Sequence, residues 1–220
     1  MDIAFERVSL RYGETVVLEE VSFRVQSGQF ALIEGPSGAG KSSMLRLINR
    51  LEDPSSGTIS ADGRPLPEWP VLQLRRQIAY VPQIPVLFPG TVRENLLTPF
   101  RFRANRDRTP PTDEELRARL SELLLEVKLE ETATTLSVGQ QQRIALLRAA
   151  LLEPRLMLCD EPTAPLDPDS REVVERTLER WNQEQGITVF LVTHQGYRPK
   201  ASRPRRFLLG RDHRLREVEA

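Results

Sequence analysis

The sequence predicts an α/β fold with a mostly parallel sheet, an N-terminal antiparallel β subdomain and an inserted helical subdomain. Three observations support this prediction. Residues 2–25 alternate between apolar and polar types, as half-buried strands do. Later apolar runs suit strands that are buried on both faces. Helical patterns lie between these runs, and the segment from about 89 to 152 interrupts the alternation with helices alone. We expect one domain over residues 1–220, because this length can build a single core.

The N-terminal strands are predicted from period-two patterns. Ile3 and Phe5 share one face of a strand, and Val21, Phe23 and Val25 repeat the pattern. Glycine-containing pairs mark the chain reversals around these strands. The turns are expected at Gly13-Glu14, Ser27-Gly28 and Asp62-Gly63.

Four apolar runs predict the central strands, at residues 30–33, 78–81, 156–159 and 187–192. Residues 207–209 predict a further apolar strand, followed by a hairpin-like stretch over residues 210–215.

Two helices are expected within the segment 89–152. Thr112 and Glu115 have the spacing of a capping box, which predicts the start of the first helix. Its apolar stripe is expected to comprise Leu116, Leu120, Leu123, Leu124 and Val127. The second helix is expected from Gly139 to Leu152.

The motif Gly-Pro-Ser-Gly-Ala-Gly-Lys-Ser follows the strand at residues 30–33 and precedes a helical pattern, which predicts a phosphate-binding loop and a P-loop NTPase core. Backbone N–H groups of such a loop surround a di- or triphosphate. Lys41 would reach the β- and γ-phosphates, and the Ser42 hydroxyl would hold Mg²⁺. The alternative is a chance match in a glycine-containing turn, which the flanking strand and helix disfavour. The predicted nucleotide-binding residues here are Gly35, Pro36, Ser37, Gly38, Ala39, Gly40, Lys41, Ser42 and Ser43.

Two carboxylates, Asp160 and Glu161, follow the strand at residues 156–159. A carboxylate at this place beside a phosphate loop can hold Mg²⁺ through water, and the next one can polarise an attacking water. Two solvated acids at a strand end would be the alternative. The phosphate loop upstream favours the catalytic interpretation.

A serine- and glycine-containing turn, Ser137-Val138-Gly139-Gln140, precedes the second expected helix of the insert. Such a turn at a helix N-terminus can bind an anion, although it also makes an ordinary helix cap. It lies about twenty residues before Asp160. Few P-loop proteins have a phosphate loop, such a turn and a strand-end carboxylate pair in this order.

Over essentially its whole length, the chain resembles the nucleotide-binding subunit of an ATP-binding-cassette (ABC) transporter. The resemblance implies ATP and Mg²⁺ as cofactors, with Glu161 activating the attacking water. It also implies that two copies face head to tail, so that each ATP lies between one chain's phosphate loop and the other chain's Ser137, Gly139 and Gln140. A transmembrane permease subunit would convert the cycle of closing and reopening into transport.

Further roles follow only from this resemblance. Tyr12 matches the aromatic residue that stacks on adenine. Gln83 matches the glutamine that contacts Mg²⁺ and signals to the membrane subunit. His194 matches the histidine that contacts the γ-phosphate, and residues 164–167 match a loop that crosses the dimer interface. Residues 87–96 lie where the permease is expected to dock.

The sequence departs from the family pattern at three positions. Val138 replaces a glycine, and valine resists positive φ. Either this position does not need positive φ, or binding by this segment is weakened. Ala164 and Pro165 replace a serine and an alanine in the crossing loop, which affects communication between the two sites rather than ATP binding.

Composition limits the possible partners. The 31 basic and 31 acidic residues balance, so we expect no direct nucleic-acid binding. The single cysteine, Cys159, excludes an internal disulfide. No apolar stretch approaches the roughly 18–20 residues that span a bilayer. Membrane contact is therefore expected only through a partner. Together with the resemblance, this implies a peripheral protein on the cytoplasmic face of the cell membrane, bound to the permease.

Two other functions stay open from the sequence. One is a soluble ABC-type ATPase that acts on a non-transport partner, and the other is a binding-only regulatory cassette. Residues 97–103 also loosely resemble small stand-alone cassettes of a metal-export type associated with iron.

Overall fold

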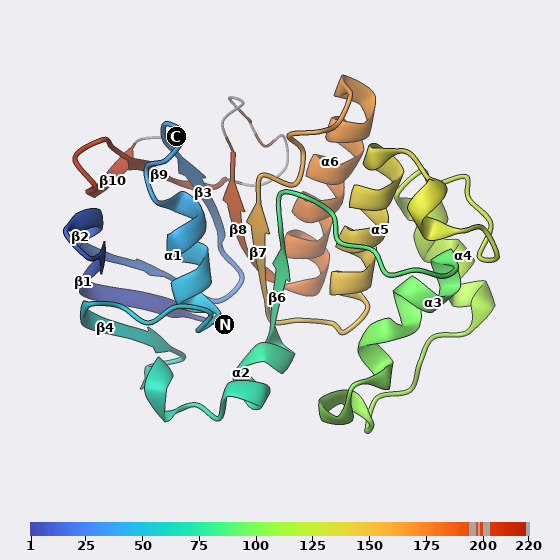
Figure 1. Ribbon diagram of the computed structural model, residues 1–220, viewed down its shortest axis with the longest axis horizontal. Helices are drawn as coiled ribbons and strands as arrows, with labels where there is room; N and C mark the ends of the chain where they lie inside the picture. Colours follow the sequence, from blue (N-terminus) through green and yellow to red (C-terminus); the bar gives the residue numbers. More distant parts are fainter. Residues whose placement is uncertain (194–196, 198, 200–202, 219–220) are drawn as a thin grey trace.

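The computed structural model describes residues 1–193, 197, 199 and 203–218, and it contains two β-sheets with helices around them (Figure 1). The first sheet is antiparallel, with the strand order β2-β1-β4-β5. Its strands are β1 (Ile3–Tyr12), β2 (Thr15–Val25), β4 (Ser56–Ala61) and β5 (Arg64–Pro65). The apolar residues predicted to share a face here pair directly across the sheet, Ile3 with Val25 and Phe5 with Phe23. The expected N-terminal antiparallel unit is confirmed.

The second sheet has six strands in the order β10-β9-β3-β8-β7-β6, and all its pairs are parallel except β10 with β9. Every residue of β7 and β8 is buried, because helices or the other sheet cover both faces. The four predicted central strands are therefore confirmed. Full burial was wrong for residues 78–81, because Ala79 and Tyr80 of this edge strand are only partly buried. The strands are β3 (Phe30–Glu34), β6 (Ile78–Val81), β7 (Leu156–Asp160), β8 (Thr188–Val192), β9 (Arg205–Leu209) and β10 (Leu215–Val218).

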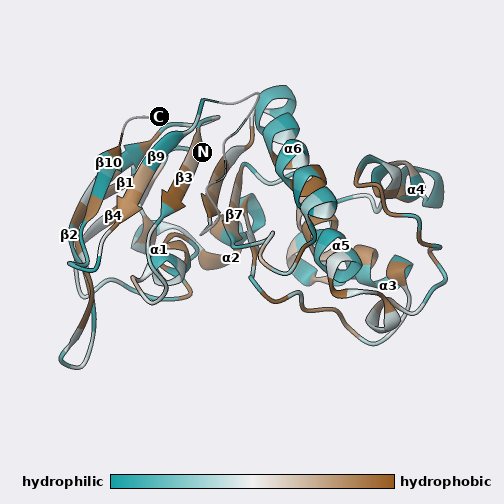
Figure 2. Cartoon of the chain, turned by 90° about the horizontal axis from the view of Figure 1, so that it is seen from above, coloured by the Kyte–Doolittle hydropathy of each residue, from teal (hydrophilic) through white to brown (hydrophobic). Residues whose placement is uncertain are grey.

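The helices lie on both sides of the parallel sheet. Helix α1 packs between the two sheets, whereas α5 and α6 cover the opposite face (Figure 1). Two apolar cores result, one on each face. Figure 2 shows β3 as a largely hydrophobic strand, whereas α6 carries many hydrophilic residues. The helices are α1 (Lys41–Ile48), α2 (Val71–Gln77), α3 (Val92–Leu97), α4 (Asp113–Glu122), α5 (Val138–Ala150) and α6 (Pro168–Gln185).

Helix α4 begins as predicted but ends earlier. The capping box of Thr112 and Glu115 is present. The helix stops at Glu122, because Leu124 adopts a left-handed conformation with φ of 48°. The Leu124 N–H then donates to Ser121 O and the Leu125 N–H to Leu120 O, which closes the helix in a Schellman motif. Leu124 is 67% exposed.

The helical stripe predicted through Leu124 and Val127 was thus wrong beyond Leu123. Sequence reasoning missed this end because glycine, and not leucine, usually occupies the left-handed position.

Helix α5 begins one residue before the predicted start. Ser137 accepts a hydrogen bond from the Gln140 N–H, and the Gln140 side chain accepts one from the Ser137 N–H. Val138 is the first residue of the helix and is 53% exposed. A helical position suits valine, so no positive φ is needed there. Gly139 is helical too, and the Leu166 Cδ2 atom would lie 3.3 Å from an added Cβ there.

No helix in the described part of the chain combines the length and the apolar character that crossing a membrane requires.

Candidate functional site

The predicted phosphate loop connects the carboxyl end of β3 to the first turn of α1. Two of its glycines are required by close backbone contacts. A Cβ on Gly35, which has φ of 151°, would lie 2.3 Å from Leu209 O. A Cβ on Gly40, which has φ of 103°, would lie 2.8 Å from Val17 O. The loop is therefore held between β9 and β2, and no other residue fits these two positions without displacing backbone.

Lys41 is buried at the start of α1, and its ammonium group donates to the carbonyl oxygens of Gly35 and Pro36, each at 2.9 Å. Burial lowers the pKa of Lys41, and the neighbouring carboxylates Glu161 and Asp160 oppose this shift. A buried cation that is directed at the phosphate loop can neutralise an incoming phosphate.

Asp160 uses both carboxylate oxygens at the end of β7. The Ser42 hydroxyl donates to Oδ1 at 2.9 Å, and the Tyr80 hydroxyl donates to Oδ2 at 2.9 Å. Burial and the charge of Asp160 raise the pKa of Tyr80, so this phenol remains a hydrogen-bond donor. The carboxylate is thus fixed in direction by groups from α1 and β6.

Glu161 follows directly and is only 8% exposed. Its Oε1 lies 3.9 Å from the Lys41 ammonium, and its Oε2 accepts a hydrogen bond of 3.2 Å from the Gln83 amide. Its backbone has φ of 48°, which is uncommon outside glycine and frequent at functional sites. The structure therefore brings together five of the predicted site residues, namely Lys41, Ser42, Gln83, Asp160 and Glu161.

Tyr12 lies at the end of β1 and is 50% exposed. Its hydroxyl group lies 3.5 Å from the Ser43 hydroxyl, on the first turn of α1. The ring is thus next to the phosphate loop and accessible to a ligand, as its predicted role requires.

The remaining predicted residues lie elsewhere. Within the described residues, no hydrogen bond joins Ser137 or Gln140 to the Lys41 cluster, and these two side chains cap α5 instead. Ala164 and Pro165 lie in the turn after β7. His194 falls outside the described residues.

Sequence reasoning missed four residues of this region. Tyr80 has a usable signal, because β6 pairs in parallel with β7 and both strands end at the same edge of the sheet. Gln142 is fully buried in α5, and its amide donates to Pro82 O at 3.3 Å, next to Gln83. Arg46 contacts Ser43 one turn away on α1. Glu52 reaches Tyr12 from the turn after α1, and no local pattern predicts this contact.

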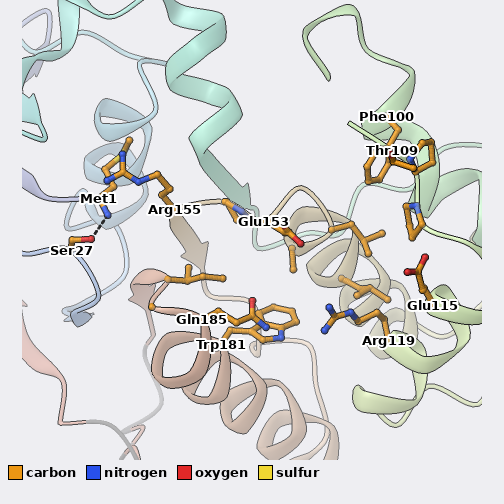
Figure 3. Close-up of a pocket in the computed structure, with 18 residues that line it drawn as sticks. Met1, Ser27, Phe100, Thr109, Glu115, Arg119, Glu153, Arg155, Trp181 and Gln185 are labelled. Atoms are coloured by element: carbon orange, nitrogen blue, oxygen red, sulfur yellow. Dashed lines mark hydrogen bonds between the residues drawn. The ribbon is translucent and has the colours of Figure 1, made fainter. Parts of the chain in front are cut away.

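Two cavities lie away from the phosphate loop. The first, of about 820 Å³, is lined by Ser27, Arg155 and Ile187, which precede β3, β7 and β8 (Figure 3). It therefore lies at the amino ends of the strands, opposite the phosphate loop. The second, of about 490 Å³, is lined by Tyr80 and Pro82 on one side and by residues 102–105 on the other. It opens beside the segment that carries Gln83.

The donor set at the phosphate loop suits Mg²⁺. The hydroxyl of Ser42, a carboxylate oxygen of Asp160 and the amide oxygen of Gln83 are the hard oxygen ligands that this ion prefers. Asp160 is buried and hydrogen-bonded to Ser42, so the oxygens of these two side chains are close enough to share one metal site. Few protein ligands are needed, because Mg²⁺ in nucleotide sites also keeps phosphate oxygens and waters.

Comparison with known proteins finds one consistent family. A family model described as ABC transporter matches residues 18–164. The glutamine transport ATP-binding protein GlnQ of Escherichia coli is 39% identical over 88% of this chain and 81% of its own length. The probable iron export ATP-binding protein FetA of the same organism is 34% identical over 87% of this chain and 84% of its own length. It agrees with the resemblance to iron-export cassettes.

Other relatives are longer. The ABC transporter I family member 17 of Arabidopsis thaliana is 38% identical over 81% of this chain, which spans 66% of that protein's length. Among solved structures, a dimeric ATP-binding cassette in a post-hydrolysis state with ADP and Pi aligns with a TM-score of 0.82 at 32% identity. This alignment covers 99% of this chain and 98% of the other.

Proposed function

The chain belongs to the ABC transporter family of ATP-binding cassettes, and from this premise we propose that it hydrolyses ATP to power a membrane permease. The observation that carries the proposal is the contact set of Glu161, which lies 3.9 Å from the phosphate-loop lysine, Lys41, and is hydrogen-bonded to Gln83. A buried carboxylate beside a phosphate-binding ammonium is the arrangement that an ATPase needs for water activation. In this proposal the site residues bind ATP and Mg²⁺, and His194 contacts the γ-phosphate.

ATP binding follows from the phosphate loop. Backbone N–H groups of residues 35–42 and the N-terminus of α1 would bind the phosphates, and Lys41 would exchange its carbonyl partners for phosphate oxygens. Mg²⁺, held by Ser42, Asp160 and Gln83, would supply charge neutralisation at the phosphate oxygens.

Hydrolysis is assigned to Glu161. Its carboxylate would accept the proton of a water that attacks the γ-phosphate in line, and the Gln83 amide would keep the carboxylate oriented. The remaining catalysis is positioning and electrostatic stabilisation by Lys41.

We further propose that two copies associate head to tail. In one chain Ser137 and Gly139 open helix α5 with an exposed Val138 beside them, so this anion-binding end is accessible to a second chain. The relative solved as a dimer with ADP and Pi supports the association of two copies. Each nucleotide would then lie between one chain's Lys41 and the other chain's Ser137.

We propose that the permease docks at the 490 Å³ groove beside Gln83, close to the predicted docking segment 87–96. Leu72 and Phe102 are exposed apolar residues at this groove. Arg148 lies in the groove too. Its Nη2 atom donates to Val86 O, and its Nη1 atom is buried without an acceptor among the described residues. Burial lowers the pKa of Arg148, so a carboxylate from a partner would stabilise its charge.

We therefore expect the permease segment that docks here to carry a carboxylate next to an apolar residue. Replacing Arg148 with Met keeps its bulk and should weaken co-purification of this chain with its permease. It should leave ATP binding by the isolated chain unchanged. Equal co-purification of wild type and variant would contradict this assignment. By this contact the chain would lie on the cytoplasmic face of the membrane, with residues 89–152 as its helical subdomain.

The test is the rate of Mg–ATP hydrolysis per subunit as a function of protein concentration. We expect the rate to rise with concentration, because the site is completed by the second chain, and to vanish in the Glu161→Gln variant. The variant should also elute as a dimer with ATP on size exclusion, whereas Lys41→Ala should stay monomeric. Glu68→Gln, which removes an exposed carboxylate paired with Arg64, is the matched control.

A rate that does not depend on concentration, or a Glu161→Gln variant that stays monomeric with ATP, would contradict the dimer mechanism. Binding of ATP without hydrolysis, in the presence of the permease, would favour a binding-only regulatory cassette. Full activity that depends on a different partner would favour the soluble ATPase.

A further inference from the structure

A chain of hydrogen bonds connects the exposed ring of Tyr12 to the helix that follows the phosphate loop. The Tyr12 hydroxyl donates to Glu52 Oε2 at 2.5 Å. Arg46 Nε donates to Glu52 Oε1 at 2.5 Å, and a second Arg46 nitrogen donates to the Ser43 hydroxyl at 2.9 Å. Neither Glu52 nor Arg46 belongs to any motif that the sequence analysis assigned to ATP.

This arrangement has the features of a positioning device. The Glu52 side chain is only 22% exposed and is bonded on both oxygens, one to a phenol and one to a guanidinium. Hydrogen bonds to charged groups are about twice as strong as neutral ones. The backbone of Glu52 is fixed as well, because the turn after α1 closes with Leu51 N–H on Arg46 O.

The Tyr12 ring is thereby tied to the same helix that carries Lys41 and Ser42. Arg46 and Ser43 lie one turn apart on α1, so their contacts set the hydroxyl end of the ring relative to the phosphate loop. A Tyr ring at the exposed end of a strand would otherwise sample several rotamers. Holding it in one of them lowers the entropy that a ligand must overcome when it stacks.

We propose that Glu52, supported by Arg46, is a positioning residue that holds Tyr12 as a preset platform for the nucleobase of ATP. This inference rests on the proposed function, because it concerns the base of the same nucleotide. Glu52 itself does not touch the nucleotide. It acts through the Tyr12 hydroxyl, so its loss affects the base and leaves the phosphates unaffected.

The experiment compares the dissociation constants of Mg–ATP and of inorganic tripolyphosphate with Mg²⁺, measured by calorimetry on the full chain. Tripolyphosphate occupies the phosphate loop but has no base to stack. Tyr12→Phe keeps the ring and removes the hydroxyl, and Glu52→Gln removes the charge of its acceptor. We expect each variant to bind ATP about three- to tenfold more weakly, a fraction of the full stacking energy of a base. Binding of tripolyphosphate should not change.

Two further results are expected. The double variant should bind ATP no more weakly than either single variant, because both remove the same link. In the Glu52→Gln variant, the maximal hydrolysis rate at saturating ATP should remain at the wild-type value while KM rises. Glu68→Gln, which removes a carboxylate from an exposed ion pair remote from Tyr12, is the control for the loss of a surface charge.

Wild-type ATP affinity in both single variants would overturn the proposal. So would an equal weakening of ATP and tripolyphosphate, because that result would mean that the network only supports the phosphate loop. A wild-type chain that binds tripolyphosphate but gains nothing from the base would also overturn it. Failure of the wild type to bind either ligand would instead overturn the proposed function, on which the inference depends.

Discussion

At the scale of single residues, the orientation of Asp160 depends on two hydroxyl groups. Ser42 and Tyr80 each donate to one of its carboxylate oxygens at 2.9 Å. Ser42 belongs to the phosphate loop and would be shared with Mg²⁺, whereas Tyr80 has no assigned contact with a ligand. The phenol of Tyr80 therefore orients the carboxylate from the oxygen that Ser42 does not contact. Its loss should weaken Mg²⁺ binding more than it lowers the stability of the fold.

We expect Tyr80→Phe to raise the Mg²⁺ concentration needed for half-maximal ATP binding by about tenfold, as is typical when a group that orients a metal ligand is removed. Titrating Mg²⁺ at fixed ATP in equilibrium dialysis measures this shift. Tyr197→Phe is a matched control, because Tyr197 is also a buried phenol bonded to a carboxylate, that of Glu179. An equal shift in both variants would show that Tyr80 has no specific role.

At the scale of elements, helices α4 and α5 begin with the same device. Thr112 with Glu115 and Ser137 with Gln140 each form a capping box. The two caps differ in their proposed duties. Thr112 only satisfies backbone N–H groups, whereas Ser137 also opens the helix end that would face the ATP of a second chain.

We therefore expect Thr112→Ala and Ser137→Ala to lower the free energy of unfolding by similar amounts, about 1 kcal/mol each. Urea unfolding measures this quantity. Only Ser137→Ala should also weaken ATP-dependent dimer formation of the Glu161→Gln chain, as followed by size exclusion. If Thr112→Ala weakened the dimer equally, loss of stability rather than a contact at the nucleotide would explain both results.

The sequence predicted the buried strands well and the helix ends poorly. Runs such as residues 156–159 are apolar throughout, and their shortness favours a strand buried on both faces over a buried helix. The end of α4 depends on one left-handed leucine, Leu124, whose conformation is fixed by hydrogen bonds to Ser121 and Leu120 rather than by residue type.

The site shows the same division. Lys41, Ser42, Asp160 and Glu161 belong to contiguous motifs, so their types and order already indicate phosphate chemistry. Glu52 reaches Tyr12 across 40 positions in sequence, and Tyr80 reaches Asp160 across 80. Contacts of this kind depend on strand order and on the path of the turn after α1, so periodic patterns in the sequence cannot predict them.

At the scale of the whole molecule, the two sheets are joined by an ion pair at their edge. Asp62, in the turn between β4 and β5, accepts a hydrogen bond of 2.7 Å from Arg155, which precedes β7. Burial alone would raise the pKa of Asp62, but the Asp2 N–H and Arg155 outweigh it and lower the pKa from 3.8. The carboxylate form thus contributes to holding the sheets together.

We expect Asp62→Asn to lower the free energy of unfolding near neutral pH by about 1 kcal/mol, since the pair is partly exposed. Asn keeps the positive φ of this turn. A lowered folded-state pKa means that the stabilisation is fully present above pH 3.8 and is lost as the pH falls through the folded value. Urea unfolding of both chains at about pH 6 and pH 3 should show a smaller difference at pH 3. A difference independent of pH would exclude the carboxylate charge as its cause.

The contact between Gln142 and Pro82 limits how the cassette can move. Gln142 is fully buried and Pro82 is partly exposed, so breaking this hydrogen bond would leave the buried amide without that acceptor, at a cost of about 1–3 kcal/mol. The contact therefore couples the position of the segment with Gln83 to that of helix α5, which has Ser137 at its tip. Under the proposed function, a permease that displaces the first would therefore also move the helix end that faces the ATP of the second chain.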